Sequence, residues 1–387
     1  MDHPLHHRLP YLRSHGDRTQ ATQLHPHLGV PGGPHGRRAG TGVRVADPAQ
    51  PEASAAALPR GLEGGAGGPV LHASQVRKVE FADLGARSPA ARRDLHPGRH
   101  VGAHLVAFLE LTKPRITQLV LLTAAAGFYL GSAGGVNVRL LVSTLIGVAL
   151  VAAGTNAFNQ VRERDVDARM HRTERRPLPS GRLTPRAASL FAGVISVAGI
   201  GYLALAVNLL TAGLAALTLG SYVLLYTPLK RKTTLNTLIG AVPGALPIVG
   251  GWTAAGGAIG PAVAALFWIL FLWQLPHFLA LAWIYREDYR RGGLAMLSVA
   301  DPDGHHTGRM VLLYAVALLP VSLLPTLLGV TGPVYFYGAL LLGIAYAGVS
   351  IAMTRATTTA RAWRVFQVSI VYLPALLTLM VVDKVLA

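Results

Sequence analysis

The chain has 387 residues, of which 51% are hydrophobic and only 14% are charged. This composition excludes an ordinary soluble domain and indicates an integral membrane protein. A formal charge of +17 would suggest nucleic acid in a soluble protein, but here the basic residues lie in short loops between apolar runs, so we expect no nucleic-acid partner. The sequence has no cysteine, which excludes disulfides, thiolate metal sites and cysteine nucleophiles.

Residues 1–100 differ from the rest of the chain. They hold 10 of the 15 histidines, many prolines and glycines, and no apolar run that approaches a membrane span. Such a segment cannot bury enough apolar surface to offset its ordering entropy. We therefore predict a disordered, basic His/Pro/Gly-rich extension at 1–100 and a membrane domain at 101–387. Adventitious metal binding by the histidines and a start codon assigned too far upstream remain alternative interpretations.

From residue 102 onward, apolar runs alternate with short loops. Each run is near the ~20 residues that cross a bilayer core. We predict an all-α membrane protein with nine transmembrane helices, at 116–134, 139–160, 187–206, 209–226, 237–254, 262–285, 309–330, 333–352 and 364–384. A short interfacial helix is expected before the first span, at 104–112.

Loop charge predicts the orientation of these spans. Of the 22 lysines and arginines from residue 101 onward, 20 lie before the first span or near the loops after even-numbered spans; Arg139 and Lys384 lie on the other side. Because cytoplasmic loops carry the excess of basic residues, the N-terminus and these loops are expected to be cytoplasmic. The protein is thus predicted to be multi-pass, in the inner (plasma) membrane if bacterial. A mitochondrial inner membrane remains open.

A polar face follows the second span. Asn159, Glu163 and Asp167 recur every four residues, so on a helix they share one face. Their oxygens and two negative charges suit a hard divalent cation such as Mg²⁺. Asp165 lies off that face. Eight arginines between 162 and 186 would suit an anionic partner, although an arginine run alone is more often an orientation signal.

Two further clusters lie on the same predicted membrane face. Lys230 and Arg231 follow the fourth span, and Asp288 follows the sixth. Because all three loops are predicted to be cytoplasmic, they would border one central cavity that opens to that face. Acids near the membrane interface usually face a cavity or a partner.

His277 lies deep in the sixth span, directly after Pro276. A histidine in a span can simply hydrogen-bond to a neighbouring helix, or it can contact a porphyrin or its iron, or orient a reacting group. If the helix continues, His277 and Asp288 share a face about 16 Å apart. The Gly and Pro residues of 240–247 predict a thin or broken fifth span, which membrane proteins tolerate mainly where it lines a cavity.

Together these motifs resemble the UbiA-type intramembrane prenyltransferases, and within them the branch that acts on haem. The resemblance runs from Leu111 to the C-terminus. Asn159, Glu163 and Asp167 are similar to the family's Asn-x3-Asp/Glu-x3-Asp motif. The other matching segments are Leu111–Arg115, Met170–Leu178, Tyr226–Arg231, Gly250–Trp252, Pro276–Phe278 and Asp288–Tyr289.

The resemblance implies a Mg²⁺-dependent transfer of a farnesyl group from farnesyl diphosphate to a vinyl group of haem b, with addition of water, giving haem O and diphosphate. It implies Mg²⁺ ligands at Asn159, Glu163, Asp167 and Asp288, and an acceptor pocket at His277. Diphosphate-binding residues would be Arg172, Arg176, Lys230 and Arg231. Association with haem A synthase or terminal oxidase assembly belongs to the same expectation.

Two alternatives remain open. The same fold could prenylate an aromatic quinone precursor or a chlorophyll precursor, which the Pro-His-Phe context of His277 disfavours. A cation transporter is a different class; it would be favoured by internal repeats or an acid at mid-membrane depth, and the sequence has neither.

Overall fold

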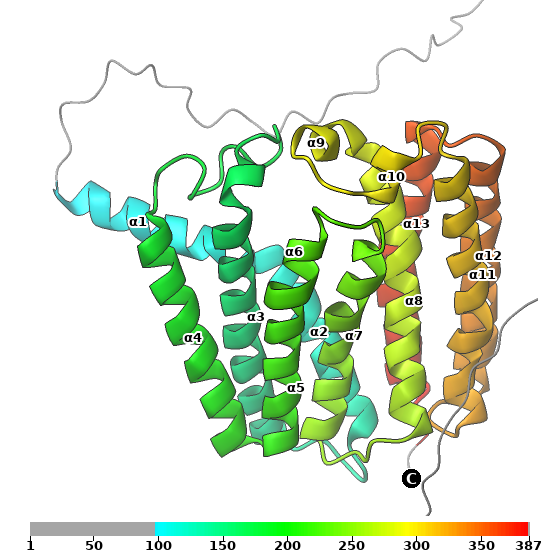
Figure 1. Ribbon diagram of the computed structural model, residues 1–387. Coiled ribbons are helices and arrows are strands. Elements are labelled where there is room, and N and C mark those ends of the chain that lie inside the picture. Colours follow the sequence, from blue (N-terminus) through cyan, green and yellow to red (C-terminus); the bar gives the residue numbers. More distant parts are fainter. Residues whose placement is uncertain (1–96, 386–387) are drawn as a thin grey trace, which may run out of the picture. The chain divides into compact units, whose positions relative to one another are not determined.

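The computed structural model describes residues 97–385, which form a bundle of helices joined by short loops (Figure 1). The described residues contain no strand beyond an isolated bridge between Thr331 and Lys384. The helices are α1 (Pro97–Leu111), α2 (Pro114–Gly131), α3 (Val138–Asp167), α4 (Pro185–Ala206), α5 (Leu209–Gly220), the π-helical turn η1 (Ser221–Tyr226), α6 (Thr227–Leu229), α7 (Asn236–Ala254), α8 (Pro261–Ile284), α9 (Arg286–Arg291), α10 (Leu297–Ala300), α11 (His305–Leu327), α12 (Pro333–Arg355) and α13 (Thr359–Val382).

The predicted all-helical membrane architecture is confirmed. Eight helical segments of the described chain are long and apolar enough to cross a membrane: α3, α4, the continuous run Leu209–Leu229, α7, α8, α11, α12 and α13. The first predicted span corresponds to α2, which has 18 residues but is not one of these eight. The count of nine spans therefore stays a prediction.

The N-terminal expectations are met by the structure only in part. The helix predicted at 104–112 is part of the longer α1, which ends one residue earlier, at Leu111, and begins at Pro97, inside the segment predicted to be disordered. The remainder of that segment, residues 1–96, lies outside the described residues.

Local sequence sets where the long helices begin. A proline occupies the first turn of several helices, where its missing N–H costs no hydrogen bond: Pro114, Pro185, Pro261 and Pro333. Side-chain oxygens cap others by accepting from a free backbone N–H, at Asn137, Thr184, Asn208 and Thr358. These signals lie at the N-terminal ends of the helices, and the apolar stretches follow them.

Small residues let α2 and α7 approach closely. A Cβ at Gly127 would collide with the carbonyl of Ile248, and one at Gly251 would collide with the carbonyl of Ala124. Close backbone contact of this kind is how small residues join membrane helices. On the other side, α8 packs against α7, α11 and α13, and bulky buried side chains such as Trp273 and Tyr372 fill the space between them.

Two expectations about irregular helices are wrong. The fifth span is not broken: α7 runs unbroken from Asn236 to Ala254 with Pro243 and Pro247 inside it. The helix of the sixth span does continue past Pro276, but α8 ends at Ile284 and a separate α9 follows. His277 and Asp288 therefore do not share the face of one straight helix.

Candidate functional site

The polar face predicted after the second span is the last part of α3, which extends without a break to Asp167. Asn159 and Asp167 are 1% and 0% exposed, and the Glu163 side chain is 12% exposed. Uncompensated carboxylates cannot be buried at this level. The structure shows what compensates them.

Each member of this face contacts a basic side chain. Lys230 Nζ lies 2.7 Å from Glu163 Oε1, and Arg176 Nη1 donates to both carboxylate oxygens of Asp167 at 2.8 and 2.7 Å. Lys113 Nζ donates to Asn159 Oδ1 at 2.9 Å. These residues form one acid–base cluster: Lys113, Asn159, Glu163, Asp167, Arg176 and Lys230.

Lys113 belongs to this cluster, although it was not among the site residues predicted from the sequence. It lies between α1 and α2, directly before Pro114, with a left-handed backbone (φ 48°) that no other non-glycine residue in the described chain adopts. Burial lowers the pKa of Lys113 to about 7, and the neighbouring Arg176 acts in the same direction. The signal in the sequence was its place in the Leu111–Arg115 motif.

Lys230 reaches the cluster because α5 ends in the π-helical turn η1. Its ammonium lies 4.5 Å from the centre of the Tyr226 ring, and Tyr226 contacts Tyr222 edge-on at 5.0 Å. Burial alone would lower the pKa of Lys230, but Glu163 holds that pKa well above its usual value. A π-helical turn often marks a functional site, and here it orients the two tyrosines beside the cluster.

The other predicted residues lie around the cluster rather than in it. Asp288 of α9 pairs with Arg291 and accepts hydrogen bonds from the backbone N–H groups of His171 and Arg172, both at 3.3 Å. The Arg172 guanidinium lies over the Tyr285 ring at 4.9 Å. Arg231 is exposed. Asp288 thus ties α9 to the loop after α3, which Figure 1 shows at the same end of the bundle.

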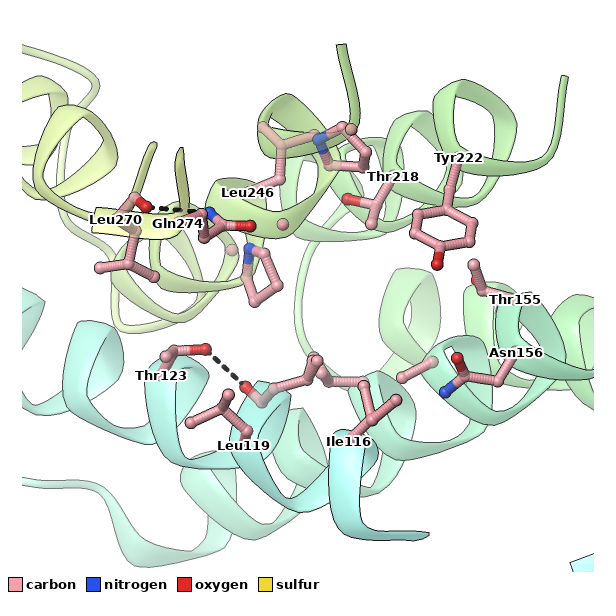
Figure 2. Close-up of a pocket in the computed structure, with 18 of the residues that line it drawn as sticks. Ile116, Leu119, Thr123, Thr155, Asn156, Thr218, Tyr222, Leu246, Leu270 and Gln274 are labelled. Carbon is pink, nitrogen blue, oxygen red and sulfur yellow. Dashed lines mark hydrogen bonds between the residues drawn. The ribbon is translucent and has the colours of Figure 1, made fainter. Parts of the chain in front are cut away.

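Next to the cluster, the helices line an apolar cavity of about 420 Å³. It is lined by α2, α3, α5, η1, α7, α8 and α13. Figure 2 shows part of its lining, including Ile116, Leu119, Thr123, Thr218, Tyr222 and Gln274. Its volume suits one small or drug-sized ligand. Tyr226 lines the cavity and also contacts Lys230, so cavity and cluster adjoin.

His277 lines this cavity, and its Nδ1 lies 2.7 Å from Ser369 Oγ of α13. The interpretation that it hydrogen-bonds to a neighbouring helix is therefore confirmed. A role toward a porphyrin stays a prediction, although the side chain borders a space for a ligand. Its ring stacks with Trp273 at 5.2 Å between centres.

The carboxylate and amide oxygens on this face of α3 are the kind of ligand that Mg²⁺ prefers. Among the described residues, no three acidic or histidine side chains converge to form a complete cage. Mg²⁺ does not need one, because it is usually bound by one or two carboxylates together with waters and substrate phosphates. Glu163 and Asp167, on successive turns of α3, could supply two carboxylates, and Asn159 could supply an amide oxygen.

Comparison with known proteins gives one consistent result. The sequence profile described as the UbiA prenyltransferase family matches residues 120–373. A protoheme IX farnesyltransferase of Solibacter usitatus is 48% identical over 288 residues, which cover 72% of this chain and 98% of that protein. One of Salinibacter ruber is 46% identical over 276 residues, covering 71% of this chain and 98% of that protein.

Solved structures agree on the fold. A digeranylgeranylglyceryl phosphate synthase superimposes with a TM-score of 0.62 at 18% identity, covering 72% of this chain and 98% of that one. A UbiA homologue of Archaeoglobus fulgidus bound to GPP and Mg²⁺ has a TM-score of 0.51 at 17% identity, covering 71% and 99%. At these identities the likeness concerns the fold alone.

Proposed function

The chain belongs to the UbiA prenyltransferase family, and on this premise we propose that it transfers a farnesyl group from farnesyl diphosphate to a vinyl group of haem b. Water is added in the same reaction, the product is haem O, and diphosphate is released. The protein is then a haem O synthase. The relatives named protoheme IX farnesyltransferase, matched over 98% of their length, support this acceptor over a quinone or chlorophyll precursor.

One observation in the structure supports farnesyl diphosphate as the prenyl donor: a buried acid–base cluster adjoins an apolar cavity at Tyr226. A prenyl diphosphate has the same two parts, a charged head and an apolar tail. The head would lie at the cluster and the tail in the cavity, away from water.

The residues in and around the cluster would have complementary tasks. Asn159, Glu163, Asp167 and Asp288 would hold Mg²⁺, which supplies neutralisation of the charge that builds on the departing diphosphate. That the homologue of Archaeoglobus fulgidus was solved with GPP and Mg²⁺ supports this. Arg172, Arg176, Lys230 and Arg231 would donate hydrogen bonds to diphosphate oxygens.

The cavity would protect the reaction. Once diphosphate leaves, an allylic cation remains, and water would quench it. The walls next to Tyr226 are mostly apolar, so they would exclude bulk water while the vinyl group attacks. His277, which also lines the cavity, would border the haem acceptor.

The basic loops support an orientation with the acid–base cluster on the cytoplasmic side, in the inner (plasma) membrane if the host is bacterial. The apolar helices would face the lipid bilayer, from which both greasy substrates could enter. Association with haem A synthase or terminal oxidase assembly stays a prediction.

The test uses membranes that contain the full chain, haem b, farnesyl diphosphate and Mg²⁺, with haem O detected by mass. We expect haem O from the unchanged chain and a loss of roughly a hundredfold or more for Asp167→Ala, because the charge on diphosphate is no longer neutralised. The matched control is Asp165→Ala: Asp165 is on the same helix but its side chain is 71% exposed, so this variant should keep full activity.

Full activity of a normally inserted Asp167→Ala variant would contradict the metal assignment. A different outcome would contradict the acceptor: no haem O from the unchanged chain, with prenylation of a phenolic acid instead.

A further inference from the structure

His277 is the one basic side chain that lines the cavity in the described part of the protein. The lining residues there include no Asp, Glu, Lys or Arg, and the other titratable groups among them are the phenols Tyr222 and Tyr226. Phenols are protonated at neutral pH. Any proton released inside the cavity would therefore pass most readily to His277.

The hydrogen bonds of Ser369 identify which nitrogen of His277 is free. Ser369 Oγ lies 2.5 Å from the carbonyl oxygen of Phe366, which can only accept, so the hydroxyl hydrogen is on that bond. Ser369 Oγ must then accept from His277 Nδ1, 2.7 Å away. In this neutral tautomer Nδ1 carries the hydrogen, and Nε2 carries a lone pair.

Aromatic neighbours fix the ring. Trp273 lies along one side with an interplanar angle of 27°, and Phe366 lies 4.9 Å away at 30°. Phe278 contacts the ring edge-on at 5.4 Å. The imidazole thus cannot turn freely, and the nitrogen opposite the Ser369 bond keeps one direction. Fixed orientation is what a proton acceptor needs.

The size of the cavity indicates which part of haem comes near His277. A volume of about 420 Å³ is near the lower end for pockets that hold one ligand. With an apolar prenyl chain in this space, we expect only the edge of a porphyrin to enter. The vinyl group lies at that edge, and the iron lies at the centre of the ring.

We propose that Nε2 of His277 is the general base that accepts a proton from the attacking water, an inference that rests on the proposed function. The vinyl π electrons form the bond to the farnesyl carbon that diphosphate has left. The cation then lies on the vinyl carbon attached to the porphyrin. A lone pair of water forms the new C–O bond there, one water proton passes to Nε2, and the product is the alcohol. The proton reaches solvent when the products leave.

The experiment compares the porphyrin products of the unchanged chain, His277→Ala and Ser369→Ala by mass, with diphosphate release measured in parallel. Without the imidazole, the cation can still form but loses a carbon-bound proton, which the released diphosphate accepts, instead of gaining hydroxide. We expect His277→Ala to release diphosphate and to make a farnesylated porphyrin lighter than haem O by one water. The ratio of haem O to this product should fall roughly a hundredfold.

Ser369→Ala keeps the imidazole and removes only the group that selects its tautomer. It should shift the product ratio in the same direction by a smaller factor, in protein that still folds. This variant tests the inference even if His277→Ala does not fold. Product ratio is a readout that a purely structural role would not move.

Three results would overturn the inference. One is an unchanged product ratio in folded His277→Ala, or in Ser369→Ala if the first variant does not fold. Another is the loss of both products by folded His277→Ala. The third is a changed axial-ligand spectrum of bound ferrous haem in that variant, which would make His277 an iron ligand. If the unchanged chain makes no haem O, the proposed function fails first and the inference fails with it.

Discussion

Glu163 and Lys230 form an ion pair in which each side chain is only 12% exposed, at a helix end where water would otherwise solvate both charges. Burying such a pair costs desolvation energy that its attraction repays only when both partners are present. Removing one partner should therefore harm stability, and removing both should not. Activity should follow a different pattern. Under the proposed function, diphosphate needs the Lys230 ammonium even in a variant whose fold no longer depends on the ion pair.

Lys230→Met tests this. It leaves Glu163 buried and unpaired, so we expect a loss of about 3–5 kcal/mol in the free energy of unfolding, together with loss of haem O formation. The double variant Glu163→Leu/Lys230→Met should regain most of the stability but none of the activity. Denaturation in detergent and the product assay separate the two effects.

Lys232→Met is the matched control, since Lys232 is exposed in the same loop. Equal loss of stability in this control would mean that the effect belongs to the loop and not to the buried pair.

Lys113 combines a strained backbone with a side-chain role. A left-handed conformation costs a non-glycine residue about 1–2 kcal/mol, and Lys113 adopts it (φ 48°). Lys113→Gly should therefore be more stable than Lys113→Ala by about 1 kcal/mol. Both should raise the KM for farnesyl diphosphate, because both lose the ammonium beside Asn159.

Thermal unfolding and steady-state kinetics of the two variants give the answer. If Lys113→Ala proves as stable as Lys113→Gly, the backbone is not strained. If both retain an unchanged KM, Lys113 does not contribute to donor binding.

Helices α2 and α7 pack with their backbones in close contact. Gly127 and Gly251 are the positions where the two backbones meet, and both helices line the cavity. Their separation thus sets part of the cavity's width. The prolines of α7 do not break it, because the neighbouring helices pack tightly around it.

Gly251→Ala should disturb this contact. Its new Cβ would meet the carbonyl of Ala124, which cannot move away easily, so we expect a loss of about 1–3 kcal/mol. In Gly213→Ala, where no atom lies within 4 Å, the change should be neutral or stabilising by about 0.5–1 kcal/mol. Thermal unfolding of both variants in one detergent checks this, and equal stability would contradict close α2–α7 packing.

The sequence predicted that three polar side chains of α3 share one helix face. It did not predict which basic side chain contacts each of them. Side chains four residues apart share a helix face, so Asn159, Glu163 and Asp167 could be grouped from spacing alone. Two of the bases that contact them come from distant segments: Lys113 is 46 residues from Asn159, and Lys230 is 67 residues from Glu163. Only tertiary packing brings these pairs together.

The break between α8 and α9 was missed for a related reason. No glycine or proline marks Tyr285, which leaves helical geometry with φ −104° and ψ 23°. Asp288 then bonds to the backbone of the loop after α3, a contact between segments 117 and 116 residues apart. Local sequence carries little information about such a contact.

At the scale of the whole molecule, charge and apolar space are separated along the bundle. The acid–base cluster lies at one end of α3, and the cavity begins at Tyr226 and extends between the helices. This division matches a substrate with a charged head and an apolar tail. It also assigns separate tasks: the cluster would ionise the donor, and the region around His277 would receive the acceptor.

The most direct test of this account is a competition experiment. The purified full chain in lipid vesicles is offered farnesyl diphosphate with equal amounts of haem b and a phenolic quinone precursor, with Mg²⁺ and then after its removal by a chelator. We predict haem O alone with Mg²⁺, and neither haem O nor diphosphate release after its removal, while the protein stays folded. A prenylated phenol, or haem O formed at an unchanged rate without Mg²⁺, would contradict the account.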